Sequence, residues 1–319
     1  MRTALIGAVD STRVALATMA DAGHPPAALL TLPPTRAARH SDYVDLEPLA
    51  RSLGVRVVHA PDVNGDDALA ALAALEPDHV FVIGWSQICR APLLAACGRG
   101  AIGYHPAPLP RLRGRGVIPW TIVLGERESG STLFWLDEGM DSGDVLDQAC
   151  FPVAPDETAA SLYAKHLVAL ETMLRRSLDR LARGDAPRTP QDHDRATYCA
   201  RRTPADGFID WRRSADEVWT LIRASGAPYP GAFTFRGGER LVVWSAERVH
   251  DRRYHGVPGQ VQAVDARGAL VQCGDGDHVL LRDVQLGAGS GGASALKVHE
   301  RLGPDVVALW ERVMREPRN

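Results

Sequence analysis

The sequence is short of several features that mark particular classes of protein. Its basic residues are nearly all arginine, with only Lys165 and Lys297 as lysines, a bias that codon usage explains first. The net charge of −3 gives no overall attraction to nucleic acid. No run of about 18 apolar residues occurs, so we expect no membrane-spanning helix. Asp10 and Arg13 interrupt the apolar N-terminal stretch, which fits a secretory signal peptide poorly.

Cysteine and glycine motifs of known chemistry are also missing. The five cysteines are scattered and no two are spaced as CxxC, so neither a zinc site nor a disulfide framework is indicated. We therefore expect free thiols and a reducing, cytoplasmic location. The glycine near the N-terminus stands in GAVDS, residues 7–11, which lacks the GxGxxG pattern of dinucleotide-binding folds. The sequence predicts neither a structural metal nor a dinucleotide cofactor.

What is present is the composition of a globular chain large enough for two domains. Of 319 residues, 45% are hydrophobic and 24% are charged, which is typical of a protein with a sizeable core. Strands and helices are expected to alternate along the first part of the chain, which predicts an α/β fold with a doubly wound, mostly parallel, Rossmann-like sheet. The expected strands are 3–9, 28–32, 55–59 and 79–84, and the expected helices are 13–22 and 68–75.

The remaining chain predicts a long helix, a linker and a smaller β domain. Apolar residues recur at helical spacing over 155–184, with Asp156 favoured over Thr158 as the N-cap. We place the first domain at 1–184 and a polar linker at 185–202. The second domain, 203–319, is expected to begin with a helix at 210–224 and continue as five short strands, a β-barrel of OB type. A mobile loop at 287–292 and a last helix at 305–315 complete this prediction.

A stiff loop carries the first candidate for chemistry. Residues 103–116 read GYHPAPLPRLRGRG, so proline and glycine restrict much of the backbone. His105 stands where a strand of an open α/β sheet is expected to end, which is where such sheets bind ligands. A partly buried structural histidine beside a proline-rich turn explains the segment equally well. The loop alone does not choose between these interpretations.

An acidic segment carries the second candidate. Residues 131–148 read STLFWLDEGMDSGDVLDQ and contain Asp137, Glu138, Asp141 and Asp144 within a short stretch. Four carboxylates suit a hard cation, but the spacing is not that of a calcium loop, and a turn rich in Asp and Gly is the commoner role. A carboxylate beside His105 would orient the imidazole and favour its cationic form.

Together the two segments resemble the transferases and hydrolases that use 10-formyltetrahydrofolate, the family of methionyl-tRNA formyltransferase. Residues 105–114, HPAPLPRLRG, are similar to the family's HxSLLPxxRG loop, and residues 137–144, DEGMDSGD, to its DxGLDTGD motif. The resemblance continues through 196–211, ATYCARRTPADGFIDW, and 258–261, PGQV. It covers nearly the whole chain, and the two catalytic motifs are specific in combination.

The resemblance implies a catalytic pair of His105 and Asp141. The family has an Asn two residues before the His, whereas this chain has Gly103, and Ala107 replaces a common Ser. We expect the oxyanion site to have one donor fewer than in the family. A backbone N–H or a water near Gly103 is expected to take the place of the missing Asn donor. The hydrolase domain of formyltetrahydrofolate dehydrogenases also lacks the Asn. This chain matches that branch at 104–106 (YHP), 84–88 (GWSQI) and 134–135 (FW).

The resemblance also places the folate, whose pterin ring binds mainly backbone groups in two loops of these enzymes. The corresponding residues are Trp85, Ser86, Gln87, Ile88, Cys89 and Arg90, opposite Leu136, Asp137, Glu138, Gly139 and Met140. Simple packing explains Trp85 at least as well as pterin binding. Cys89 is expected to be a pocket wall rather than a nucleophile, because no partner histidine is evident. The formyl donor implied is 10-formyltetrahydrofolate.

Four functions remain open at this point, and the sequence does not determine the oligomeric state. We favour transfer to an amine or hydroxylamine of a small metabolite, such as an amino sugar or a siderophore precursor. Methionyl-tRNA is an alternative; the loop 33–45 is barely basic, but the second half of the chain is rich in arginine. The arginines that keep tRNA open include Arg201, Arg202, Arg212, Arg213, Arg252 and Arg253. Hydrolysis is a third function, and a noncatalytic folate-binding module, against which His105 and Asp141 argue, is a fourth.

Overall fold

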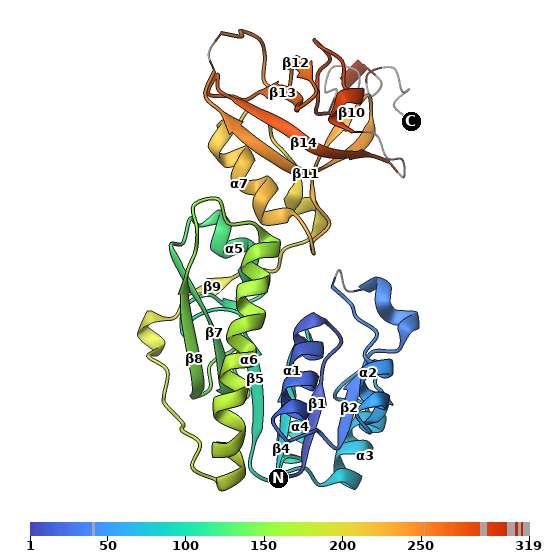
Figure 1. The fold of residues 1–319 in the computed structure, drawn as a ribbon, viewed down its shortest axis with the longest axis vertical. Helices are drawn as coiled ribbons and strands as arrows, with labels where there is room; N and C mark the ends of the chain where they lie inside the picture. The colour runs from blue at the N-terminus through green and yellow to red at the C-terminus, as the bar shows by residue number, and fades with distance from the viewer. Residues whose placement is uncertain (40–41, 252, 288–291, 305–309, 312–313, 315–319) are drawn as a thin grey trace. The chain divides into compact units, whose positions relative to one another are not determined.

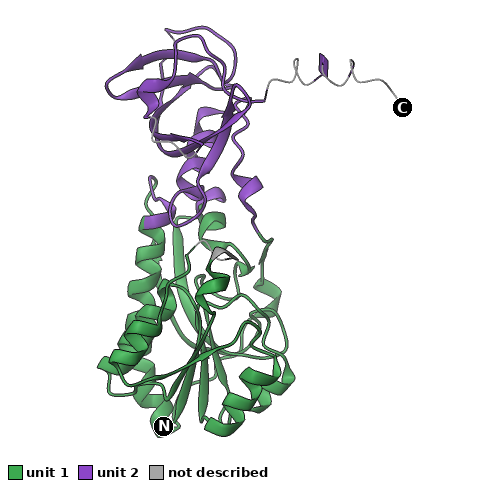
Figure 2. Ribbon diagram, turned by 90° about the vertical axis from the view of Figure 1, so that its right-hand side faces the viewer, with its two compact units in different colours: residues 1–121, 125–155, 161–201 green, residues 122–124, 156–160, 202–319 purple. Residues whose placement is uncertain are grey.

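A computed structural model describes residues 1–39, 42–251, 253–287, 292–304, 310–311 and 314. The chain forms two compact units, coloured green and purple in Figure 2. Unit 1 comprises residues 1–121, 125–155 and 161–201, and unit 2 comprises 122–124, 156–160 and 202–319. This division places the expected linker, 185–202, almost wholly inside unit 1.

Unit 1 is built on a seven-stranded sheet in the order β3-β2-β1-β4-β5-β7-β8 (Figure 1). The first five strands are parallel, and the last two continue the sheet in antiparallel pairing. The strands are β1 (Thr3–Ile6), β2 (Ala28–Thr31), β3 (Arg56–His59), β4 (His79–Val82), β5 (Ala101–His105), β7 (Glu128–Trp135) and β8 (Val145–Pro152). The predicted doubly wound, mostly parallel α/β sheet is confirmed. The strand order reverses between β1 and β4, where such sheets bind ligands.

Helices cover both faces of this sheet because successive side chains of each buried strand point to opposite sides. Leu5 and Phe81 pack with α1, α2 and α6 on one face, whereas Ala4 and Val80 pack with α3 and α4 on the other. The helices are α1 (Asp10–Asp21), α2 (Glu47–Ser52), α3 (Asp66–Leu75), α4 (Ala91–Ala95), α5 (Val117–Val123) and α6 (Ala159–Arg183), with a 3-10 helix, η1, at Pro34–Arg39.

The long helix α6 begins later than the sequence predicts. Its first residue is Ala159, so Thr158 and not Asp156 occupies the N-cap position. The predicted apolar stripe is present, since Leu170, Met173 and Leu174 are fully buried against the sheet. The helix ends at Arg183, and Gly184 follows with a positive φ of 79°.

Unit 2 contains the small antiparallel β domain that the sequence predicts. Its five-stranded sheet has the order β10-β11-β14-β13-β12, and helix α7 packs on it. The elements are α7 (Ala215–Ser225), β10 (Ala232–Arg236), β11 (Glu239–Val249), β12 (Val261–Asp265), β13 (Gly268–Gln272) and β14 (His278–Leu286), with 3-10 helices η3 (Pro204–Gly207) and η4 (Ala293–Ala295).

The expected helix at 210–224 is wrong at its start. Ser214 forms a capping box with Glu217, its hydroxyl accepting from the Glu217 N–H and its own N–H donating to the Glu217 carboxylate at 3.0 Å. The helix therefore starts at Ala215, and Trp211 is buried in the preceding turn. The expected last helix, 305–315, lies outside the described residues except at 310–311 and 314, and 288–291 of the expected loop are also outside them.

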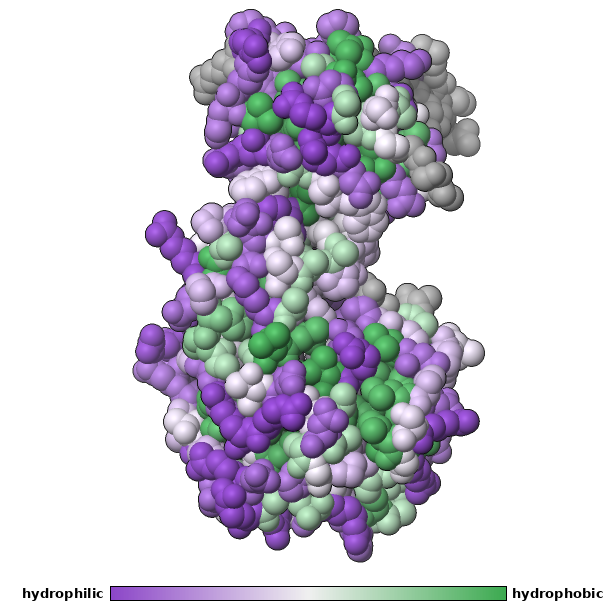
Figure 3. Space-filling model, in the orientation of Figure 1, coloured by the Kyte–Doolittle hydropathy of each residue, from purple (hydrophilic) through white to green (hydrophobic). Residues whose placement is uncertain are grey.

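No helix in the described part of the chain is both long and apolar enough to cross a membrane. The face shown in Figure 3 mixes hydrophilic and apolar residues over both units.

Candidate functional site

His105 is the last residue of β5 and is 5% exposed. Its Nε2 lies 2.7 Å from the Leu112 carbonyl oxygen. A carbonyl only accepts, so Nε2 carries the hydrogen of this bond. Nδ1 is the ring nitrogen left for chemistry, and it lies 3.7 Å from Oδ2 of Asp141. This distance is too long for a hydrogen bond, and the two groups form an ion pair when the imidazole is protonated.

Asp141 lies in the turn between β7 and β8, in a left-handed conformation with φ of 51°. Its Oδ2, the atom that faces His105, accepts the N–H of Gly114 at 2.8 Å. About a quarter of its side chain is exposed, whereas that of His105 is nearly buried. The pair that the sequence predicts is thus brought together across two loops, and it opens to solvent on the Asp141 side.

A buried arginine holds the Asp141 turn through a glutamine, neither of which the sequence analysis identified as part of the site. Arg113 is 2% exposed, and its Nη2 donates to Oε1 of Gln191 at 2.7 Å and to Nδ1 of His193 at 3.1 Å. Nε2 of Gln191 in turn donates to the carbonyls of Asp141 at 2.9 Å and Gly143 at 2.6 Å. Gln191 therefore links the His105 loop to the Asp141 turn.

The segment expected to be a linker forms one wall of the site. Its strand β9 (Tyr198–Cys199) pairs in parallel with β6 (Arg113–Gly114), and Oγ1 of Thr197 accepts the N–H of Leu112 at 2.8 Å. Because the Leu112 carbonyl holds the His105 ring, this pairing sets the orientation of the imidazole. The resemblance over 196–211 was the signal in the sequence that could have placed these residues at the site.

Two polar side chains of the sheet anchor the other end of the histidine loop. Oγ1 of Thr132, on β7, donates to the Ala107 carbonyl at 2.7 Å and accepts the N–H of Leu109 at 3.2 Å. Nε2 of Gln148, on β8, donates to the Leu109 carbonyl at 2.9 Å. The loop is therefore bonded at both ends, which pre-organises His105.

Gly103 faces side chains that leave no space for an Asn. A Cβ atom on Gly103 would lie 2.7 Å from Cδ2 of Leu136 and 2.8 Å from the ring of Phe134. Gly103 also lies in the sheet between Val82 on β4 and Phe134 on β7, so its own N–H faces a neighbouring strand. The apolar side chains of Leu136 and Phe134 occupy the place where the family's Asn side chain would begin.

The first predicted folate loop, residues 85–90, is bonded to residues 61–64. Gln87 accepts the N–H of Val63 at 2.9 Å and donates to the Pro61 carbonyl at 3.0 Å. Asn64, which the sequence analysis did not name, donates to the Ile88 carbonyl at 2.9 Å and accepts the N–H of Arg90 at 2.8 Å. Ser86 and Ile88 remain exposed. The backbone of this loop is thus held in one conformation while part of it stays open to a ligand.

The second predicted loop meets the first in an apolar cluster. Leu136 and Trp85 pack against the cluster that contains Cys89. Trp85 thus packs as expected, and its Nε1 is buried without a hydrogen-bond partner in the structure, a donor that a pterin could use. Asp137 accepts the N–H of Gly139 at 3.0 Å and therefore shapes the turn, while Glu138 and Met140 are exposed.

Two other chemical roles were open at this site, a cysteine nucleophile and a bound metal ion. Burial raises the pKa of the Cys89 thiol to about 12, so it is protonated at neutral pH and unsuited to act as a nucleophile. Within the described ranges, no three His, Cys, Asp or Glu side chains are grouped so as to hold a metal ion. The acidic segment instead supplies a turn through Asp137 and the partner of His105 through Asp141.

Replacing Gln191 is expected to reduce turnover although Gln191 does not contact His105. Gln191→Leu removes both donors to the Asp141 turn, and a small displacement of the carboxylate should lower kcat/KM about 10- to 100-fold. Gln191→Glu offers Arg113 a charged acceptor, so we expect a higher melting temperature than for Gln191→Leu with equally low turnover. Steady-state kinetics and thermal unfolding test this. Wild-type turnover in both variants would show that Gln191 does not position Asp141 for catalysis.

Comparison with known proteins identifies the family. The formyl transferase model matches residues 18–177, and the model of the formyl transferase C-terminal domain matches 201–292. Methionyl-tRNA formyltransferase of Symbiobacterium thermophilum is 34% identical over 288 residues, which cover 89% of this chain and 88% of that protein.

Solved structures with the same fold include HypX from Aquifex aeolicus in complex with tetrahydrofolic acid. It matches 100% of this chain and 48% of its own, with a TM-score of 0.64 and 18% identity, so this chain spans about half of HypX. An N-formyltransferase from Helicobacter canadensis, solved with folinic acid and dTDP-3-aminofucose, matches 88% of this chain and 99% of its own, with a TM-score of 0.62 and 16% identity. From the matched models and the 34% identical relative, we conclude that this chain belongs to the formyl transferase family as a folate-dependent formyltransferase.

Proposed function

We propose that this enzyme transfers the formyl group of 10-formyltetrahydrofolate to the amine or hydroxylamine nitrogen of a small metabolite. The observation that carries the catalytic assignment is the state of His105. Its Nε2 is used by the Leu112 carbonyl, and its Nδ1 faces the Asp141 carboxylate at 3.7 Å. This arrangement offers one nitrogen and one carboxylate oxygen to a single reacting centre.

His105 and Asp141 then share the proton transfers of the reaction. When the acceptor nitrogen attacks the formyl carbon, negative charge develops on the formyl oxygen, and protonated Nδ1 of His105 donates a hydrogen bond to it. Asp141 stabilises the imidazolium and accepts the proton of the attacking nitrogen, directly or through a water. As the bond from carbon to the folate nitrogen breaks, that nitrogen takes up the proton that Asp141 accepted, relayed through Nδ1 of His105, so both residues return to their starting states and tetrahydrofolate leaves.

The donor-binding surface is supported by the two loops that meet at the apolar cluster. Trp85 offers an unpaired indole N–H, and the thiol of Cys89 is a protonated, apolar wall. Ile88 and Met140 are 70% and 55% exposed, so they are available to cover a flat ring. These features fit a pterin, which needs backbone contacts in a largely apolar slot.

The charges of unit 2 favour a small acceptor over tRNA. Acidic and basic residues are nearly equal in number over 202–319. Seven of the arginines that the structure describes in this range form ion pairs with carboxylates, which lowers their value for releasing counterions from a phosphate backbone. The pairs are Arg212–Asp210, Arg213–Glu217, Arg236–Glu300, Arg248–Asp216, Arg253–Asp251, Arg267–Asp265 and Arg282–Glu247.

Two other acceptors have an observation in their favour. The 34% identical relative is a methionyl-tRNA formyltransferase, which supports tRNA. The absence of the family's Asn at Gly103 supports water, as in the hydrolase branch that the loop resembles.

Release of tetrahydrofolate from 10-formyltetrahydrofolate tests the three acceptors in parallel. We expect release to depend on a small amine from a panel of nucleotide-linked amino sugars and N-hydroxylated amino acids, and to change little between 50 and 200 mM salt. Release that needs methionyl-tRNA and falls steeply with salt would identify the tRNA enzyme instead. Rapid release without an acceptor would identify a hydrolase.

A further inference from the structure

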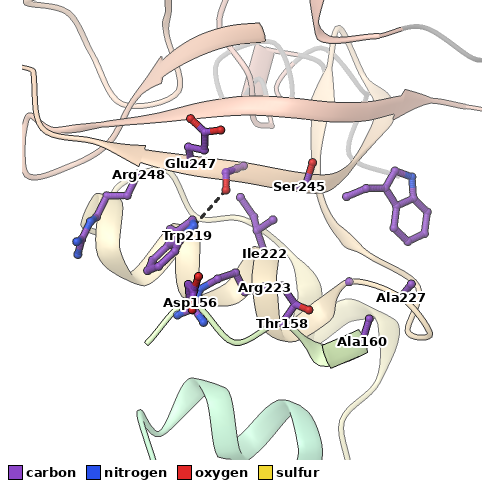
Figure 4. A pocket seen from close by; sticks show the side chains of 13 residues that line it. Asp156, Thr158, Ala160, Trp219, Ile222, Arg223, Ala227, Ser245, Glu247 and Arg248 are labelled. Carbon is purple, nitrogen blue, oxygen red and sulfur yellow. Dashed lines mark hydrogen bonds between the residues drawn. The ribbon is translucent and has the colours of Figure 1, made fainter. Parts of the chain in front are cut away.

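A pocket of about 630 Å³ lies in unit 2, separate from the residues of the catalytic loop (Figure 4). Every residue that lines it belongs to unit 2, from α7 and the turn after it, from β11 and from residues 156–160. Its volume is within the range of small-molecule sites in proteins. Nothing in the formyl-transfer chemistry derived above uses this pocket.

Two tryptophans form aromatic walls of the pocket. Nε1 of Trp219 donates to the Ala246 carbonyl at 3.1 Å, and Nε1 of Trp244 donates to Oε1 of Gln285 at 3.3 Å. Both indoles are half-buried and contribute to the lining. Because each ring is fixed by its N–H, it offers a pre-organised apolar surface, which suits stacking of a planar ligand.

Arg223 supplies a positive charge to the pocket. Its guanidinium carbon lies 3.9 Å from the centre of the Trp219 ring, and its Nη1 donates to the Glu157 carbonyl at 2.5 Å. Its Nε is buried without a hydrogen-bond partner among the described residues. Burial lowers the pKa of Arg223, while the charges of Asp156 and Glu157 partly offset this effect.

Two other charged residues of the pocket, Arg248 and Glu247, form ion pairs. Arg248 contacts Asp216, and Glu247 lies 3.5 Å from Arg282. Asp156 is exposed at the edge of the pocket, beside Arg223 in Figure 4. Nη2 of Arg223 donates to Oγ1 of Thr220 at 3.3 Å, so each terminal nitrogen of Arg223 keeps one N–H beyond the bond that it forms, and an anionic ligand group would gain charge-assisted hydrogen bonds from them.

We propose that this pocket binds a planar aromatic ring that carries an anionic group, the chemistry of a nucleotide or an aromatic carboxylate. The ring stacks on the indoles of Trp219 and Trp244, and the anion binds the guanidinium of Arg223. Neither the ring nor the anionic group is sufficient alone. Asp156 repels an anion that has no ring to stack, and a neutral ring brings no negative charge to Arg223.

Isothermal titration of the full-length chain tests this without the folate reaction. We expect adenosine monophosphate or indole-3-acetate to bind, and adenosine and inorganic phosphate to bind at least tenfold more weakly. Arg223→Met and Trp219→Leu should each weaken binding at least tenfold. Arg240→Met is the matched control, since Arg240 also stacks on an aromatic ring, at 3.8 Å from Phe233, but does not line the pocket.

A second variant distinguishes loss of binding from loss of folding. Ser245 is exposed on β11 and lines the pocket, so Ser245→Trp should fill the pocket and abolish binding without removing a core contact. His105→Ala should leave the affinity unchanged, which separates this site from the catalytic one. Absence of saturable binding of either aromatic anion, equal affinity in Arg223→Met or Ser245→Trp, or loss of binding in His105→Ala would overturn the proposal.

Discussion

Replacing His105 by Ala is expected to lower kcat/KM for formyl transfer by about 10²- to 10⁴-fold. The variant loses Nδ1, the donor that we propose for the developing charge, and with it the group that faces Asp141 at 3.7 Å. Asp141→Asn should cause a loss in the same range, because an amide still accepts the Gly114 N–H but neither takes a proton nor stabilises a cation. Steady-state release of tetrahydrofolate measures both effects.

The chain offers a matched control in a second His–Asp pair. Nε2 of His24 lies 2.9 Å from Oδ1 of Asp179, closer than the 3.7 Å between His105 and Asp141, but 72% of the Asp179 side chain is exposed. His24→Ala and Asp179→Asn should therefore retain wild-type turnover, since exposed ion pairs contribute little and neither residue belongs to the His105 loop or the Asp141 turn. If His105→Ala or Asp141→Asn kept near wild-type turnover in folded protein, the catalytic assignment would be wrong.

Restoring the family's Asn by Gly103→Asn is expected to destabilise the enzyme and not to improve it. A Cβ at this position meets Leu136 and Phe134 at 2.7 and 2.8 Å, distances that real Cβ contacts do not show. Overpacking of this kind typically lowers the free energy of unfolding by about 1–3 kcal/mol. In unit 1, this corresponds to a fall in melting temperature of roughly 2–12 °C. Thermal unfolding measures the fall directly.

Removing the side chains that crowd Gly103 should reverse this loss of stability. The triple variant Gly103→Asn/Phe134→Ala/Leu136→Ala removes both contacts, so it should be more stable than Phe134→Ala/Leu136→Ala and provide a second oxyanion donor. Such a donor is typically worth about 2.7–4 kcal/mol in the transition state. Gly98→Asn is the control, because a Cβ there meets ordinary contacts of 3.5 Å or more. Wild-type stability of Gly103→Asn would contradict the packing argument.

Local patterns in the sequence were sufficient for most of the fold. Short apolar runs predicted β1 to β4, of which β1, β2 and β4 are buried throughout and β3 only in part, and helical spacing predicted α6, which buries its apolar stripe. The errors lie at boundaries set by single polar contacts. The capping box of Ser214 and Glu217 starts α7 five residues after the predicted position, and Trp211 stays outside it.

The sequence by itself determined the family and the candidate residues, because the motifs around His105 and Asp141 are contiguous and specific. Only the tertiary structure decided how those residues are held. Gln191 reaches the Asp141 turn from 50 positions along the chain, and Leu112 holds the His105 ring through a backbone carbonyl that no motif reveals. The space beside Gly103 was likewise undetermined, since it depends on side chains of a neighbouring strand. Phe134 and Leu136 fill it because antiparallel pairing of β5 with β7 places them there, and pairing is a long-range property.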